Sequence, residues 1–143
     1  MRAEDFPRMP FAQIAYGRIV YWITILSALI CTVGPVVAMA NPENNVMNPH
    51  YLFRAIFDGK SSEEVWAQVG GGFPGGHFYL DNLDKGDGFT QLGLALGCSV
   101  ALWALLVAAL AYIRQKNLLY AILATWVAAL VFLSASGIVS QGH

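Results

Sequence analysis

Charged residues are scarce in this sequence, and their scarcity is uneven along the chain. Only 12% of the 143 residues are charged and 57% are hydrophobic, whereas soluble domains carry about 25% charged residues. Three runs contain no charged residue: 19–40, 91–113 and 118–139. A helix needs about 20 apolar residues to cross a hydrocarbon core, and lipid requires each backbone group to be bonded within its own segment. The sequence therefore predicts an all-α membrane protein with three transmembrane helices.

Other absences argue against whole classes of function. The net charge is −1 and there is no basic tract, so we expect no nucleic-acid partner. Cys31 and Cys98 lie in apolar runs without a C-x-x-C motif and are interpreted as packing residues. The apolar runs hold no Asp, Glu, Lys, Arg or His for a proton pathway, and hence no axial histidine for haem. We expect no catalytic residue, no cofactor and no metal, and hence not an enzyme.

The apolar runs divide the chain into seven segments. Residues 1–18 precede the first span (19–40), a long loop covers 41–90, and the second span (91–113) is joined to the third (118–139) by the turn 114–117, with a tail at 140–143. Such a short turn requires an antiparallel helical hairpin. Pro35, after Gly34, is expected to kink the first span, because proline lacks the backbone donor.

A cleaved signal peptide is an alternative interpretation of the first run. Its end, Ala38-Met39-Ala40, resembles an A-x-A cleavage site. The run is longer than a usual signal-peptide core and follows 18 residues, so we expect it to be retained.

Basic residues predict the orientation. Five lie before the first span or in the 114–117 turn, whereas the loop 41–90 has three basic against seven acidic residues. By the positive-inside rule, the N-terminus is expected in the cytoplasm. The loop and the C-terminus are then extracytoplasmic, in a bacterial inner membrane.

The loop 41–90 is expected to contain two short amphipathic helices. Asn48-Pro49 is a helix-start signal, and Ser61 or Ser62 would cap a second helix that ends at Gly70. Helices this short are not stable alone in water, so they must lie on the membrane surface, on the chain's own helices or on a partner. We give partner docking equal weight to the other two together. The expected docking residues are Tyr51, Phe53, Phe57, Trp66, Phe73, His77, Phe78 and Tyr79.

Three features of the loop resemble ligand sites but have simpler explanations. The glycine-rich segment 70–79 lacks the G-K-[ST] ending of a phosphate-binding loop, and we interpret its glycines as allowing close approach to a neighbouring surface. The acidic segment 81–88 resembles a calcium loop, but its glycine is out of register and no bidentate glutamate follows. His50 and His77 are a possible metal pair, although lone loop histidines are more often surface groups.

Small residues at intervals of four predict how the helices pack. Close approach at such rows drives helix association in lipid, and Ser27 and Cys31 form such a pair on the first span. The expected packing residues of the other two spans are Gly93, Gly97, Ala101, Ala124 and Ala128.

From Gly93 onward the chain resembles a family of small bacterial three-helix membrane proteins of uncharacterised function, often encoded beside anion or sulfonate exporters. The resemblance rests on the glycine-rich start of the second span and on the segment 112–120, YIRQKNLLY. Gly17-Arg18 and Ser27-Ala28 are also similar. The family tends to carry a proline and an arginine in the second span, which this chain lacks, and its loop is shorter. The resemblance implies no catalytic residue.

These observations favour a non-catalytic integral membrane subunit that scaffolds or docks a larger membrane complex. A respiratory electron-transfer complex is the expected host, and the partners are other membrane subunits and the lipid bilayer. The alternative, which the resemblance favours, is an accessory subunit of an anion transporter.

Overall fold

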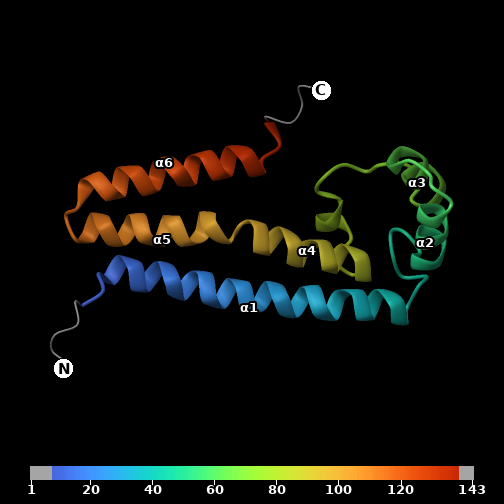
Figure 1. Ribbon diagram of the computed structural model, residues 1–143, viewed down its shortest axis with the longest axis horizontal. Coiled ribbons are helices and arrows are strands. Elements are labelled where there is room, and N and C mark those ends of the chain that lie inside the picture. The colour runs from blue at the N-terminus through green and yellow to red at the C-terminus, as the bar shows by residue number, and fades with distance from the viewer. Residues whose placement is uncertain (1–7, 139–143) are drawn as a thin grey trace. The chain divides into compact units, whose positions relative to one another are not determined.

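The computed structural model describes residues 8–138 and is helical, with no strand in that range (Figure 1). Its elements are α1 (Phe11–Ala40), α2 (Pro49–Phe57), α3 (Ser62–Val69), the 3₁₀ helix η2 (Phe78–Asp81), α4 (Gly86–Cys98), α5 (Val100–Arg114) and α6 (Leu118–Ala135). Three helical stretches are long and apolar enough to cross a membrane: Phe11–Ala40, Gly86–Arg114 and Leu118–Ala135. The predicted all-α class and the three candidate spans are therefore confirmed.

The first two helical stretches begin before their apolar runs, whereas α6 ends at Ala135, short of the predicted end of the third span at residue 139. α1 begins at Phe11, before its apolar run, because polar residues end a hydrophobic run without ending a helix. The carbonyl of Pro10 accepts from the N–H groups of Gln13 and Ile14. The second stretch begins at Gly86 and is interrupted at Ser99, between α4 and α5. α1 continues as one helix through Pro35. Residues 1–7, residue 139 and the predicted tail lie outside the described range.

The chain divides into two compact units. One contains α1 up to Ile25 together with α5 and α6, and the other runs from Leu26 to Gly97.

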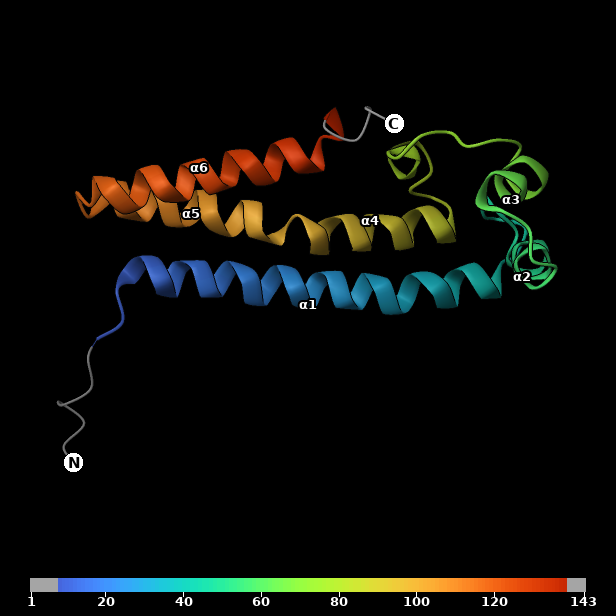
Figure 2. The same cartoon turned by 45° about the horizontal axis from the view of Figure 1, so that its top comes forward.

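In the first unit, α5 and α6 form an antiparallel hairpin whose interface is built from alanine. The two helices run side by side in both views (Figures 1 and 2). Small side chains spaced three or four residues apart lie on one helix face and let two backbones approach closely. The buried alanines of these helices are Ala104, Ala108, Ala109, Ala111, Ala121, Ala124 and Ala128. Ala124 and Ala128 were predicted to pack, whereas the predicted Ala101 is only half-buried.

The hairpin turn closes through a left-handed residue. Lys116 has a φ of 57°, and its N–H donates to the Ile113 carbonyl at 3.0 Å while the Asn117 N–H donates to the Tyr112 carbonyl at 2.9 Å. These two bonds form a Schellman motif, which satisfies the last carbonyls of α5. Tyr112 and Tyr120 stack beside the turn, with ring centroids 5.5 Å apart.

In the second unit, glycines let α4 lie against α1. The Ser27 hydroxyl donates to the Gly93 carbonyl at 2.8 Å. A Cβ added to Gly93 would lie 2.7 Å from Ile30 Cγ2, and one added to Gly86 would lie 2.6 Å from the Ala38 Cα. A Cβ on Gly97 would meet the Ser27 hydroxyl oxygen at 2.6 Å. Gly93 and Gly97, both predicted as packing residues, therefore face the Ser27–Cys31 segment of α1.

Both loop helices begin where the sequence predicts. The Asn48 side chain accepts from the His50 N–H and Pro49 is the first helical residue of α2. Ser61 caps α3 in a reciprocal capping box with Glu64. The Ser61 backbone N–H, and then its side chain, lower the pKa of the Glu64 carboxyl. The two helices pack through the buried Ala55 and Val65.

Candidate functional site

The start of the loop is held against the start of α4 by the Asp87 carboxylate. One oxygen accepts from the Val46 N–H at 3.0 Å and from the Gly88 N–H at 2.8 Å. The other oxygen accepts from the Met47 N–H at 2.9 Å. Three backbone donors that would otherwise need water are satisfied by one side chain, in the first turn of a helix where a negative charge is favourable.

Asn45 completes this connection from the other side. Its amide oxygen accepts from the Asp87 N–H at 3.1 Å. Its amide nitrogen donates to the Ala38 and Asn41 carbonyls at 3.0 Å each and to the Pro42 carbonyl at 3.1 Å. Asn45 therefore joins the end of α1 to the beginning of α4. We call these two side chains and their bonds the Asn45–Asp87 clasp.

Next to the clasp, the loop and the helix ends enclose a largely apolar pocket of about 540 Å³. α1 and α4 contribute one part of its lining, and the loop from Met47 to Phe78, with α2, α3 and the start of η2, contributes the rest. The lining residues are Pro35, Ala38, Met39, Met47, Pro49, Leu52, Phe53, Trp66, Phe73, Gly76, Phe78, Asp87, Thr90 and Gln91.

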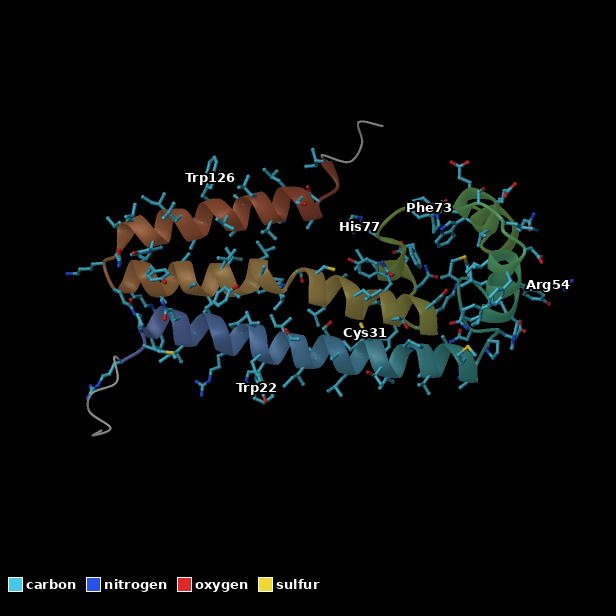
Figure 3. All side chains as sticks on the ribbon, viewed as in Figure 1. Trp22, Cys31, Arg54, Phe73, His77 and Trp126 are labelled. Carbon is cyan, nitrogen blue, oxygen red and sulfur yellow. The ribbon has the colours of Figure 1, made fainter. Side chains whose placement is uncertain are left out.

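Trp66 is the centre of an aromatic cluster in this pocket. Its ring meets Phe73 edge to face at 5.3 Å and Phe78 at 5.6 Å between centroids, a geometry that stabilises aromatic pairs beyond their buried area. Phe73 lies against α3 (Figure 3). A Cβ on Gly70 would lie 2.8 Å from the Trp66 ring, so the residue that ends α3 must be small.

The predicted docking residues separate into two groups. Phe53, Trp66, Phe73 and Phe78 line the pocket. Tyr51 and Phe57 on α2 are 63% and 86% exposed, and the neighbouring Ile56 is also exposed. His77 is exposed and lies 6.2 Å from Tyr79 between ring centroids. The expected apolar face of α2 is thus mostly outward, because the smaller Pro49 and Ala55 occupy its buried side.

The glycine-rich segment has a different physical basis from the one the sequence suggested. Gly71, Gly72 and Gly75 have φ values of 72°, 116° and 101°, and a Cβ at any of them would meet nothing within 4 Å. The interpretation as close surface approach was wrong at these positions. They need glycine because their backbone is left-handed, and Gly70 alone of the segment 70–76 makes a close approach.

The acidic segment also has a structural use. Asp87, its last acidic residue, binds backbone N–H groups with both oxygens. Between residues 8 and 138 no group of three or more His, Cys, Asp or Glu side chains is placed to hold a metal ion.

Sequence reasoning missed Asn45, Asp87 and Gln91. One sequence pattern indicates a role for Asp87: it is an acidic residue between Gly86 and Gly88, in the first turn of α4. The apolar run by itself predicts a helix that begins only at Gln91. Asn45 gave no signal, since its partners are carbonyls and an N–H fixed by the fold.

Comparison with known proteins gives a family but no activity. A protein-family model matches residues 12–138. An uncharacterised protein of Archaeoglobus fulgidus is 27% identical over 120 residues, which cover 82% of this chain and 77% of the relative. No solved structure matches.

Asp87→Asn tests the clasp locally. An amide can keep the oxygen that faces Val46 and Gly88 but presents its NH₂ to the Met47 N–H, so that bond is lost. Leaving one donor unpaired costs about 1–3 kcal/mol, and we expect hydrogen exchange of the Met47 amide to rise by roughly tenfold or more. Asp81→Asn, the same charge change at an exposed residue, is the control and should leave Met47 unchanged. Equal exchange in both variants would contradict the role of Asp87.

Proposed function

The chain belongs to the uncharacterised family whose model it matches, and from this premise we propose that it is a non-catalytic integral subunit of a larger membrane complex, with its loop as the docking element. The observation that carries the proposal is the exposed apolar face of α2, formed by Phe57 and Ile56 with Phe53 one turn before them. Contiguous exposed apolar side chains of this kind mark interaction sites.

A lipid setting is supported by the outward side chains of the first unit. Trp126 points away from α5 (Figure 3) and is 65% exposed, and Leu110 and Ile122 are exposed to a similar degree. The buried positions are alanines, whereas the large apolar residues face outward. Such a distribution is unfavourable in water and favourable in lipid, where small residues mediate helix contacts.

A protein partner fits the loop better than the bilayer surface does. The segment 41–90 has three basic and seven acidic residues, and segments that bind anionic lipid are basic. Glu63 and Glu64 are exposed on α3, and Arg54 projects outward from α2 (Figure 3). Apolar residues with charged neighbours are typical of a protein interface with a polar rim.

The host complex is proposed on broader grounds. A respiratory electron-transfer complex remains the leading host, because such assemblies recruit small subunits that have no chemistry of their own. The alternative is an accessory subunit of an anion transporter, following the resemblance of residues 93–120. Deleting the gene separates the two: respiration falls in the first case, and the flux of one anion falls with respiration intact in the second.

Gentle solubilisation of native membranes tests the subunit proposal. The chain should migrate with a stoichiometric set of partners rather than as a 15.5 kDa monomer. Replacing the most exposed aromatic of α2, in Phe57→Ser, should release those partners, since loss of a central aromatic anchor costs about 2 kcal/mol or more. Leu80→Ser removes a similarly apolar, exposed loop residue outside α2 and should retain them. Migration of the unaltered chain as a monomer would refute the proposal.

The proposed orientation has the loop outside the cytoplasm. In a background with Cys31 and Cys98 replaced by alanine, we expect a membrane-impermeant maleimide to label Glu63→Cys on intact cells. Gln115→Cys, in the turn between α5 and α6, should react only after the cells are opened. Labelling of the turn in intact cells, with protection of the loop, would reverse the orientation.

A further inference from the structure

The pocket contains a side-chain amide that has no hydrogen-bond partner among residues 8–138. Gln91 lies in the second turn of α4, within a stretch apolar enough to cross a membrane, and lines the pocket. Two other polar side chains of the lining are engaged: the Asp87 oxygens accept three N–H groups and the Thr90 hydroxyl donates to the Gly86 carbonyl at 2.8 Å. Within residues 8–138, the Gln91 amide makes no hydrogen bond to the protein. Gln91 is half-buried, and in a lipid setting an amide beside apolar walls is unfavourable unless something pairs with it.

The rest of the lining suits a flat ring. Phe53, Trp66, Phe73 and Phe78 supply aromatic faces and edges, and Met39 and Met47 supply thioethers that favour contact with aromatic rings. The volume of about 540 Å³ falls in the range of about 300–1,000 Å³ typical of small-molecule sites, which combine apolar walls with few placed polar groups.

We propose that this pocket binds a lipid-soluble molecule whose flat ring carries a carbonyl or hydroxyl oxygen, the chemical class of the quinones. The ring lies against the aromatic cluster around Trp66, and its oxygen pairs with the Gln91 amide. This proposal rests on the membrane setting proposed above, but it does not depend on the partner that α2 docks.

Two other occupants fit the observations less well. The ester carbonyl of a phospholipid also accepts from an amide, but a flexible acyl chain does not match the flat aromatic walls of the pocket. A tyrosine from a partner protein would satisfy the amide, but it would fill only a small part of the pocket.

Trp66 provides a direct probe of binding. Trp22, Trp103 and Trp126 are exposed and can be replaced by phenylalanine, which leaves Trp66 as the only tryptophan. The purified chain in lipid nanodiscs is titrated with a short-tailed naphthoquinone while Trp66 fluorescence is recorded. Naphthalene of the same tail, which does not quench tryptophan, is then added as a competitor, and its binding is measured from the recovery of Trp66 fluorescence. A variant that keeps only Trp126 reports collisional quenching by quinone dissolved in the lipid.

We expect the quinone to quench Trp66 saturably and Trp126 linearly. Naphthalene should bind about tenfold more weakly than the quinone, because it lacks one hydrogen bond. Gln91→Leu should weaken quinone binding by a similar factor and remove the preference over naphthalene. Gln115→Leu, the same change at an exposed turn residue, should do neither.

Other outcomes overturn the proposal. Quenching of Trp66 that rises linearly with quinone, as for Trp126, would mean that there is no site. If the unaltered chain bound naphthoquinone and naphthalene with equal affinity, the pocket would accept any apolar group. This comparison needs no variant, so it remains valid even if Gln91→Leu fails to fold. Loss of binding only when a co-purifying protein is present would assign the pocket to a partner's side chain. Monomeric migration of the chain, in contrast, would refute the docking proposal and leave this one standing.

Discussion

The Asp87 carboxylate lies at the end of a closed segment of chain, where it accepts hydrogen bonds from Val46 and Met47, about 40 positions earlier in the sequence. Closing a segment of that length costs conformational entropy, and the loop helices are too short to be stable alone. Three hydrogen bonds of the clasp join the two ends and offset that cost: two from the Val46 and Met47 N–H groups to the Asp87 carboxylate, and one from the Asp87 N–H to the Asn45 amide oxygen. The position of the loop over the ends of α1 and α4, and therefore the pocket itself, depends on this clasp.

The clasp in turn requires the close approach of α4 to α1. Gly86 precedes Asp87 and lies against the Ala38 backbone, where a Cβ has no room. The sequence Gly86-Asp87-Gly88 thus combines a contact that only glycine permits with a carboxylate that faces backbone donors. The segment 81–88 resembles a calcium loop in sequence, yet the Asp87 carboxylate accepts hydrogen bonds from backbone N–H groups of the protein.

Local signals in the sequence were sufficient for the helices and insufficient for the site. Apolar runs predicted three candidate spans, and Asn48-Pro49 and Ser61 with Glu64 predicted the starts of α2 and α3, because capping depends on residues a few positions apart. The pocket combines residues from Pro35 to Gln91, and no local pattern encodes such a meeting. Aromatic composition predicted docking residues in the loop, but not that Phe53, Trp66, Phe73 and Phe78 line one pocket while Tyr51 and Phe57 lie outside it. Phe53 and Phe73 line it while remaining 50% and 64% exposed. The glycines of 70–76 were recognised, but their left-handed φ values depend on the path that the chain takes after α3.

The loop therefore has two separate surfaces, an inward pocket around Trp66 and an outward face on α2, and both depend on the clasp. A double-mutant cycle of Asn45→Ala and Asp87→Ala tests this directly. The readout is hydrogen exchange at the Leu52 and Val65 amides, which are bonded within α2 and α3 and should open when the loop is released. If the clasp acts as one unit, the double variant opens no more readily than the worse single variant, with a coupling of about 1–2 kcal/mol. Strictly additive effects, or no effect on these two amides, would contradict the account.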